Sequence, residues 1–183
     1  MTLFPMMIDL AGQSVLILGT GEEAQEKARR MEPFGCAIRA MATEDFTEFP
    51  APLPRLVILA DRFHPKNDAI AARCRELGIP VNAVDDPARC DFIFPSLITR
   101  GSLTVALSTG GAAPAAGKLL RQRLEQALPE DMEGLMDWAA DLTARLRAEI
   151  PDMALRGKVL RTAIGLAFDL GRPLTEEELE LQK

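Results

Sequence analysis

A short apolar run that stops at two closely spaced glycines constrains this chain more than any other feature. Ser14–Leu18 is apolar after its first residue and leads into Gly19-Thr20-Gly21. A run of this kind, bounded by glycine, is typical of a strand buried in a parallel sheet. Glu22–Met31 then holds strong helix formers, with acidic residues early and basic residues late, which complements the helix dipole. The sequence therefore predicts a strand, a tight turn and a helix.

The same alternation of strand and helix continues through the first half of the chain. Further strands are expected over 37–42, 55–60, 79–84 and 102–107, with a loop over 43–54 and a helix over 67–77. Alternation of this kind favours a parallel sheet with helices on both faces. We therefore predict an α/β, Rossmann-like domain over residues 1–112.

Beyond residue 112 the pattern changes to helices alone. Helices are expected over 114–127, 131–149, 152–170 and 175–181, with prolines between them. These helices are predicted to form a second region over residues 113–183. Helical appendages often form the subunit interface of an oligomer, so this region is expected to serve dimerisation and to lie on the substrate side.

The bulk properties exclude several classes of protein. A chain of 183 residues can bury a substantial core, and its net charge of −6 argues against non-specific nucleic-acid binding. Its apolar runs are too short for a membrane span, and the N-terminus lacks the basic start of a signal peptide. Cys36, Cys74 and Cys90 form no CxxC motif, which favours reduced thiols in a cytoplasmic protein.

The glycine turn fits a dinucleotide-binding pattern. Gly19 permits the tight turn, Gly21 lets a pyrophosphate approach the backbone, and the small Ala24 lets the helix pack on the strand. An acidic residue for the ribose hydroxyls is expected near the end of the second strand, where Glu44 is the candidate. Arg39 either neighbours a 2′-phosphate or is a solvated surface residue, so the sequence leaves NAD or NADP open.

Two aspartates follow the strand over 79–84. Because ligands bind beyond the carboxyl ends of parallel strands, Asp85 is a candidate general base or metal ligand. Alternatively, Asp85-Asp86-Pro87 simply makes a turn, and the pattern leaves both readings open. His64, the single histidine, is expected to be a loop residue and cannot make a histidine-based metal cluster by itself. We predict no metal site.

A second glycine-containing loop separates the strand over 102–107 from the next helix. Ser108, Thr109, Gly110 and Gly111 offer hydroxyls and backbone N–H groups at a helix N-terminus, which suits a carboxylate or phosphate. The alternative is a flexible connection without a ligand. Nearby basic side chains either face such an anion or are solvated: Arg100, Lys118, Arg121 and Arg123.

Four segments together resemble the precorrin-2 dehydrogenases of siroheme biosynthesis, which include the N-terminal half of the multifunctional siroheme synthase. The segments are Leu3–Leu10, Leu16–Ala28, Ile79–Pro95 and Leu103–Leu120, in the family's order. The third resembles the family's Pro-Val-Asn-Val-Val-Asp-Asp-Pro…Cys-Asp-Phe-Ile-Phe-Pro segment. The fourth resembles its Ser-Thr-Gly-Gly segment, and these two matches are long and specific.

The resemblance implies an NAD-dependent oxidation of precorrin-2 to sirohydrochlorin by a homodimer, with ferrous iron insertion in some members. It makes Asp85 the acid/base residue and assigns the substrate's carboxylates to Ser108–Gly111. Thr109 stands where one branch of the family carries a phosphorylated serine. The cofactor contacts that it implies are Gly19, Gly21, Glu22, Glu23, Thr43 and Glu44.

The chain departs from the family pattern on the cofactor side. Thr20 replaces the middle residue of a triple glycine, and Glu23 replaces a valine. After the third strand, Ala60-Asp61-Arg62-Phe63 replaces the family's Ala-Thr-Asp-Asp. These departures motivate an alternative, a relative that binds a tetrapyrrole without redox chemistry. A further alternative is an unrelated nucleotide-dependent oxidoreductase.

Overall fold

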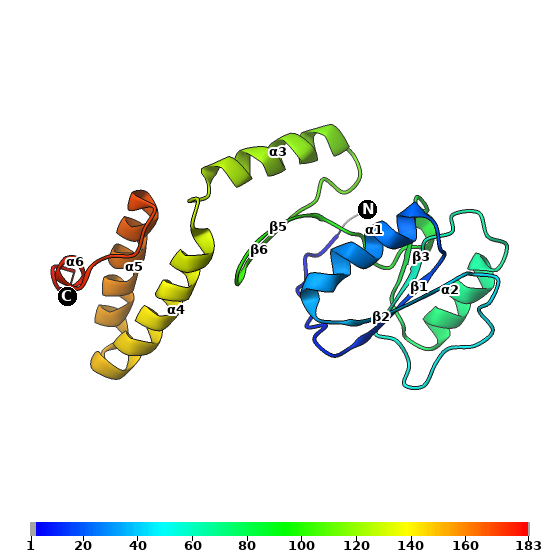
Figure 1. Ribbon diagram of the computed structural model, residues 1–183, viewed down its shortest axis with the longest axis horizontal. Helices are drawn as coiled ribbons and strands as arrows, with labels where there is room; N and C mark the ends of the chain where they lie inside the picture. Colours follow the sequence, from blue (N-terminus) through cyan, green and yellow to red (C-terminus); the bar gives the residue numbers. More distant parts are fainter. Residues whose placement is uncertain (1–2, 183) are drawn as a thin grey trace. The chain divides into compact units, whose positions relative to one another are not determined.

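The chain forms two compact units, shown in Figure 1. A computed structural model describes residues 3–182. The first unit, here called the sheet unit, is Phe4–Phe94. The second, here called the helical unit, contains Leu3 and the residues from Pro95 onwards.

Four parallel strands form the sheet unit's core. They are β1 (Ser14–Leu18), β2 (Ala37–Met41), β3 (Leu56–Leu59) and β4 (Val81–Ala83). Their order is β2-β1-β3-β4, and every pairing is parallel. The chain leaves β1 for a neighbour on one side and returns to a neighbour on the other. The carboxyl ends of β1 and β3 therefore form a topological switch point, where open α/β sheets bind ligands. The predicted α/β, Rossmann-like fold is confirmed.

Two helices cover the opposite faces of this sheet (Figure 1). They are α1 (Glu22–Met31) and α2 (Asn67–Glu76). Val15 packs in the cluster that contains α1 residues, and its neighbour Leu16 packs in the cluster that contains α2 residues. Both side chains are fully buried, so the strand is apolar on both faces, as its continuous apolar run predicts. Two short 3₁₀ helices complete the unit: η1 (Glu32–Phe34) and η2 (Pro87–Arg89).

The predicted strand over 102–107 does not join the parallel sheet. It is β6 (Leu103–Leu107), which pairs antiparallel with β5 (Ser96–Arg100), a strand that the sequence analysis missed. Gly101 lies in the two-residue turn between them with a φ of 53°. Glycine adopts this backbone conformation without steric cost, and the tight turn makes the hairpin a local pairing. The hairpin is therefore a separate two-stranded sheet.

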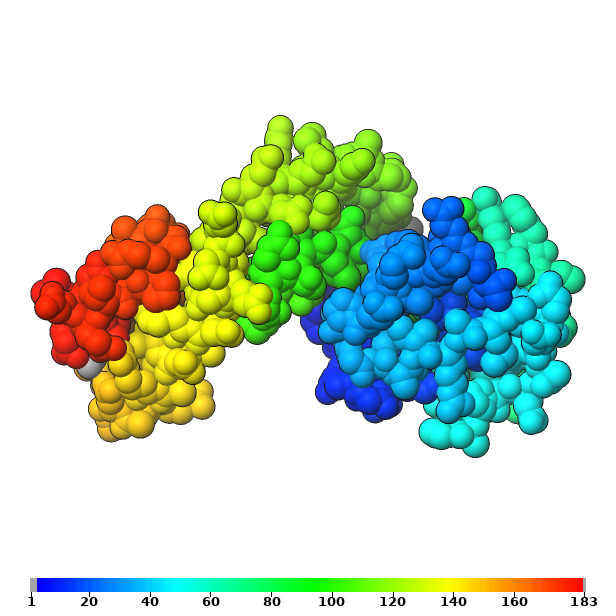
Figure 2. Space-filling model, viewed as in Figure 1, coloured from blue at the N-terminus to red at the C-terminus, as the bar shows by residue number. Residues whose placement is uncertain are grey.

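The hairpin belongs to the helical unit, so the units divide between Phe94 and Pro95 rather than after residue 112. Within that unit β5 contacts the helix α3 (Pro114–Ala127), and β6 contacts α4 (Met132–Glu149). Figure 2 shows the green hairpin atoms packed against the yellow-green atoms of α3. The expected boundary was too late because the strand over 103–107 was paired with the wrong partner.

Two further helices end the described chain: α5 (Met153–Leu170) and α6 (Glu176–Glu180). A cluster of buried side chains from α4, α5 and α6, including Leu135, Ala163 and Leu179, forms the core of this part. Side-chain caps define where the helices begin: Asp131, Asp152 and Thr175 each accept hydrogen bonds from backbone N–H groups of the first turn. None of the helices within residues 3–182 has the length and apolar character that a membrane span requires.

Candidate functional site

Gly19 lies where three strands of the sheet meet. Its N–H donates to the Met41 carbonyl oxygen at 2.8 Å, and its φ is 130°. A Cβ atom placed on it would lie 3.1 Å from the backbone nitrogen of Asp61 and 3.2 Å from the Cβ of Ala60. A side chain at this position would therefore meet both backbone strain and a close neighbour. The turn after β1 requires glycine here because the end of β3 occupies the space.

The N-terminus of α1 opens onto free space. Gly21 is its N-cap, and no side chain accepts a hydrogen bond from the first turn. A Cβ atom on Gly21 would have no neighbour within 4 Å. Uncapped N–H groups and the positive end of the helix dipole attract an anion. This cradle fits the pyrophosphate of a dinucleotide.

The acidic residues of the first turn affect this cradle unequally. Glu22 and Glu23 both carry negative charge at the helix start. Glu23 forms an ion pair with Lys27, one turn further along α1, at 3.7 Å. Lys27 Nζ lies nearer to Glu26, at 2.8 Å, so it offsets only part of the negative charge that replaces the family's valine.

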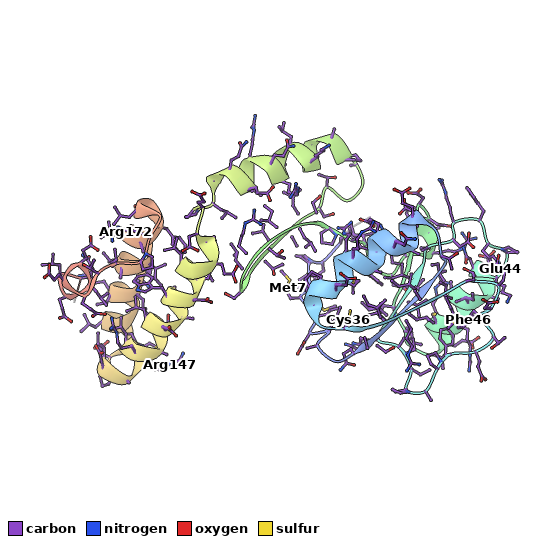
Figure 3. All side chains as sticks on the ribbon, in the orientation of Figure 1. Met7, Cys36, Glu44, Phe46, Arg147 and Arg172 are labelled. Atoms are coloured by element: carbon purple, nitrogen blue, oxygen red, sulfur yellow. The ribbon has the colours of Figure 1, made fainter. Side chains whose placement is uncertain are left out.

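The loop after β2 presents Glu44 and buries Thr43. The Thr43 side chain is fully buried, and its hydroxyl has no hydrogen-bond partner among the described residues. Its hydroxyl therefore cannot reach a ligand at the surface, and only its backbone remains available. Glu44 is exposed and accepts, through its carbonyl oxygen, a hydrogen bond from Lys66 Nζ at 2.6 Å. Lys66 Nζ also donates to the carbonyl oxygen of Phe46, and Figure 3 labels Glu44 and Phe46.

Glu44, Asp61 and His64 bring three potential metal-binding groups within 4.8 Å of one another. The Lys66 backbone N–H donates to His64 Nδ1 at 3.2 Å, so the neutral imidazole carries its proton on Nε2. That nitrogen faces Glu44 Oε1 at 3.6 Å. A metal-bound histidine instead donates from its other ring nitrogen to an acceptor. These residues therefore fit a His–Glu pair that orients the Glu44 carboxylate better than a metal centre.

Asp85 follows β4 in an unusual backbone conformation. Its φ is 56°, the one positive value among the described non-glycine residues. Its side chain is 64% exposed and lies 3.1 Å from Arg62 Nη1, measured from Oδ2. Arg62 follows β3, which is the neighbour of β4 in the sheet. A parallel sheet brings the residues after neighbouring strands to one edge, so the β3–β4 pairing, which the sequence does not show, is what identifies Arg62 as part of the site.

The structure separates the roles of the two aspartates. Asp86 pairs with Arg89 of η2, and Arg89 also reaches Asp68 of α2 at 2.7 Å. The hydrogen bond from Arg89 lowers the pKa of Asp68 below its ordinary value. Asp86 and its partners thus stabilise the turn, while Asp85 projects towards solvent. The turn interpretation therefore applies to Asp86, and the acid/base role of Asp85 stays a prediction.

Cys90 holds the same turn from inside. Its Sγ accepts a hydrogen bond from the Ala83 N–H at 3.2 Å and donates towards the carbonyl oxygens of Ala83 and Asp86. Burial raises the pKa of the Cys90 thiol. The thiol therefore supports the backbone around Asp85 and is poorly suited to act as a nucleophile.

The second glycine loop is ordered by its own hydroxyls. Ser108 Oγ accepts a hydrogen bond from the Gly110 N–H at 3.0 Å, and Thr109 Oγ1 accepts one from the Ala113 N–H at 3.4 Å. Each hydroxyl hydrogen remains available to donate to a ligand. Gly110 and Gly111 have φ values of 62° and 82°. The loop is a hydrogen-bonded turn with donors to spare, at the N-terminus of a helix that has no side-chain cap.

Two of the basic residues near this loop are already paired. Arg100 and Arg121 each lie 3.0 Å from the carboxylate of Glu125. Lys118 is exposed on α3 and forms no ion pair among those found in residues 3–182. Gly117 lets α3 approach the loop, because a Cβ atom there would lie 3.4 Å from Thr109 Cγ2. Of the predicted basic set, Lys118 is thus better placed to meet an anion than the arginines bound to Glu125.

Comparison with known proteins defines first the class and then the family. A family model described as "Putative NAD(P)-binding" matches residues 6–96, and one described as "Sirohaem biosynthesis protein central" matches residues 100–127. The parallel sheet and glycine turn thus belong to a dinucleotide-binding protein, and the predicted cofactor NAD is confirmed. The chain belongs to the precorrin-2 dehydrogenase and siroheme synthase family, as the resemblance predicted.

Individual relatives support this assignment. Siroheme synthase of Psychrobacter sp. is 33% identical over 175 residues, which cover 85% of this chain and 36% of that protein. Siroheme synthase of Methylococcus capsulatus is 34% identical over 200 residues, which cover 98% of this chain and 42% of that protein. The chain therefore spans less than half the length of these relatives. A solved structure named "SirC, precorrin-2 dehydrogenase" has the same fold, with a TM-score of 0.68, 17% identity, and coverage of 98% of this chain and 96% of that one.

Proposed function

We propose that the chain catalyses the NAD-dependent oxidation of precorrin-2 to sirohydrochlorin in siroheme biosynthesis. One observation carries the proposal: the sheet unit has an uncapped glycine turn after β1 and an exposed carboxylate, Asp85, after β4, both at the carboxyl edge of one sheet. A cofactor site and an acid/base group at the same edge are what a proton-coupled hydride transfer requires. The family assignment supplies the substrate class.

The oxidation removes a hydride and a proton from the macrocycle. In balance, precorrin-2 and NAD⁺ give sirohydrochlorin, NADH and a proton. NAD supplies the hydride acceptor. The Asp85 carboxylate accepts the proton through its side-chain oxygens, and its exposure lets it pass the proton to solvent. The hydrogen-bonded turn around Cys90 holds the backbone that presents this carboxylate.

Three parts of the sheet unit hold the cofactor in this proposal. The free N–H groups after Gly21, at Glu22 and Glu23, face the pyrophosphate. Gly19 gives the turn its shape. Glu44, oriented by His64, accepts hydrogen bonds from ribose hydroxyls. Thr43 contributes only through its backbone, because its side chain is buried.

The helical unit supplies contacts to the substrate. The hydroxyls of Ser108 and Thr109 and the backbone N–H group of Gly111 donate to the carboxylates of the tetrapyrrole, while the Gly110 N–H stays on Ser108 Oγ and shapes the loop. Their geometry suits this task, since both hydroxyl oxygens already accept backbone hydrogen bonds and direct their hydrogens elsewhere. Helix α3 adds the favourable end of its dipole.

The proposed homodimer rests on the apolar surface of the helical unit. Leu119, Leu120 and Leu124 of α3 each expose more than 40% of their surface. Exposed apolar patches on helices commonly mark protein interfaces. Sedimentation equilibrium on the purified chain is expected to give twice the mass of one chain, and a monomer at all concentrations would contradict the dimer.

Iron insertion is a second candidate activity for the same carboxylate. Asp85 is exposed and could accept the protons that leave the macrocycle nitrogens when ferrous iron enters. The test supplies sirohydrochlorin and ferrous iron anaerobically and compares the rate with the spontaneous reaction. Acceleration that is lost in Asp85→Asn supports the activity, and a rate equal to the spontaneous one excludes it.

The main experiment follows sirohydrochlorin formation by absorbance under anaerobic conditions. Wild-type protein is expected to turn over precorrin-2 only when NAD is present. Asp85→Asn should lower kcat by roughly 100-fold or more, the usual worth of a general base, without unfolding the protein. Glu76→Gln is the matched control, since Glu76 is an exposed carboxylate on α2 that pairs with Arg73. Tight tetrapyrrole binding without NAD binding or turnover would support the non-redox alternative instead.

A further inference from the structure

Arg62 is the one basic side chain that pairs with Asp85 among the contacts of the described residues. The two atoms of the pair, Arg62 Nη1 and Asp85 Oδ2, lie 3.1 Å apart, and the side chains are 50% and 64% exposed. Ion pairs at this exposure are weak and exchange readily with other charged groups. The Arg62 guanidinium can therefore leave Asp85 for another carboxylate at little cost in free energy.

Asp85 does not need Arg62 to hold its position. The backbone on either side is fixed by hydrogen bonds from Val84 N–H to the Leu59 carbonyl at 3.0 Å and from Asp86 N–H to the Ala83 carbonyl at 3.2 Å. The left-handed conformation of Asp85 follows from this framework. Loss of the ion pair would leave the carboxylate in place, unpaired.

The surroundings of Arg62 suit a flat ligand that carries carboxylates. Its guanidinium lies over the ring of Phe63, 4.8 Å from the ring centre, and Phe63 is 84% exposed. A guanidinium is planar and can bond a carboxylate through two parallel N–H groups. The exposed ring beside it offers an apolar face against which a planar macrocycle can pack. Asp61, Glu44 and His64 lie together at this edge, and the lysine beside them, Lys66, is held by the carbonyl oxygens of Glu44 and Phe46.

We propose that Arg62 is a substrate-binding residue that rests on Asp85 in the free protein and exchanges it for a carboxylate of the tetrapyrrole. Binding of the substrate thereby unpairs Asp85 at the moment when its carboxylate is needed. This inference rests on the proposed function, because it gives Arg62 a task on the same substrate. It also gives a purpose to the Arg62-Phe63 pair, which stands where the family pattern has two aspartates.

The test is a double-mutant cycle in which the affinity for the probe, sirohydrochlorin, is measured by absorbance or fluorescence titration. The four proteins are the wild type, Arg62→Gln, Asp85→Asn and the double variant. Arg62→Gln should weaken binding roughly tenfold, the scale of one charge-assisted hydrogen bond. Arg62→Lys should recover part of that loss. Arg73→Gln is the matched control, since Arg73 is an exposed arginine on α2 of the same unit.

The sign of the Asp85→Asn effect separates exchange from simple charge repulsion. If Arg62 rests on Asp85, then Asp85→Asn frees the guanidinium and tightens binding several-fold in the wild-type background, but much less in the Arg62→Gln background. If Asp85 merely repels an anionic ligand, the tightening is at least as large without Arg62. Equal tightening in both backgrounds, unchanged binding in Arg62→Gln, or no binding by the wild type overturns the inference.

The same proteins distinguish this failure from failure of the proposed function. A wild type that binds sirohydrochlorin with the predicted cycle, but makes no NADH from precorrin-2, contradicts the oxidation and keeps the role of Arg62 in binding. If the wild type oxidises precorrin-2 but the effects of Arg62→Gln and Asp85→Asn on binding simply add, only the role of Arg62 is contradicted. Circular dichroism on each variant confirms that the fold is retained.

Discussion

Each unit of the chain contains a strand that runs into glycines and then a helix, but the two segments are held in different ways. In the sheet unit, Gly19 is packed against the end of β3, so its neighbours define the turn. In the helical unit, a Cβ atom on Gly111 would touch nothing within 4 Å, and the loop is held by the hydroxyls of Ser108 and Thr109. A turn fixed by its neighbours keeps its shape without a ligand. A loop whose hydroxyl oxygens accept backbone hydrogen bonds keeps its hydroxyl hydrogens for a ligand.

The helices that follow the two glycine segments differ in charge. Helix α1 begins with Glu22 and Glu23, whereas α3 has no acidic residue in its first turn. Both helices lack a side-chain cap, so both leave N–H groups for an anion. The loop before α3 therefore suits a substrate with many carboxylates, while the cradle at α1 must work against local negative charge.

The largest expected effect is that of Gly19→Ala. Its φ of 130° and the 3.1 Å approach to the Asp61 nitrogen make any side chain both strained and crowded. We expect a loss of about 3 kcal/mol in the free energy of unfolding, measured by urea titration. Gly21→Ala is the control, because its Cβ would meet open space; it should leave stability unchanged while weakening NAD binding. Equal destabilisation by both would contradict the difference between the two glycines.

The second effect in size is that of Gly111→Ala in the other loop. Its φ is 82°, but no neighbour lies within 4 Å of the added Cβ. Only backbone strain applies, so the expected cost is about 1 kcal/mol in the same urea titration. Sirohydrochlorin binding should weaken, and NAD binding should not change. A cost as large as that of Gly19→Ala would show that the loop is fixed by packing after all.

The third prediction concerns acid and the helical unit. The hydrogen bond from Arg172, together with that of the Thr175 N–H, lowers the pKa of Glu178 from 4.5 to about 2. A depressed carboxyl pKa stabilises the fold above pH 4.5 and loses that contribution as pH falls towards 2. Glu178 also caps α6, which buries Leu179 in the helical core. Glu178→Gln should therefore be less stable than the wild type at neutral pH, with the difference vanishing in acid.

Trp138, the single tryptophan of the chain, reports on this transition. It packs against the core of the helical unit, so its fluorescence follows that unit rather than the sheet. Urea titrations at several pH values, read by this signal, measure the difference between the wild type and Glu178→Gln. A difference that stays constant down to pH 2 would contradict the role given to the Arg172–Glu178 pair.

The smallest expected effect is the change in NAD affinity when one negative charge is removed from the N-terminus of α1. Glu23→Gln removes a carboxylate beside the proposed pyrophosphate site and leaves Lys27, its partner at 3.7 Å, paired with Glu26 at 2.8 Å. NAD should bind about threefold more tightly, which is the scale of an exposed charge interaction. Calorimetric titration measures the change, with Glu76→Gln as the control. Weaker NAD binding in Glu23→Gln would mean that Glu23 contacts the cofactor favourably.

Sequence patterns located the strands and helices that are determined by residues close together in the sequence. The apolar runs of β1 and β3, bounded by glycine or polar residues, predicted buried strands, and α3 lies at 114–127 as expected. β5, a five-residue strand that directly follows Pro95, was missed. The partner of a strand depends on a turn, here at Gly101, and this turn moved the strand over 103–107 into a hairpin.

The candidate site was predictable in its positions but not in its contacts. The glycine turn and Asp85 were located from spacing after strands. The Asp85–Arg62 pair depends on which strands are neighbours, and the His64–Glu44 contact joins two loops that are distant in sequence. The burial of Thr43 depends on how the loop after β2 folds back on the core. Tertiary packing decides all three.

The central claim is that hydride removal from precorrin-2 is coupled to NAD on this chain. The most direct measurement is an anaerobic reaction of the purified wild-type protein with precorrin-2 and NAD, in which NADH and sirohydrochlorin are quantified together. The account predicts that NADH and sirohydrochlorin appear in equal amounts. Both should form faster with the protein than in the uncatalysed reaction. Sirohydrochlorin formation without matching NADH, or no reaction beyond the uncatalysed rate, would contradict it.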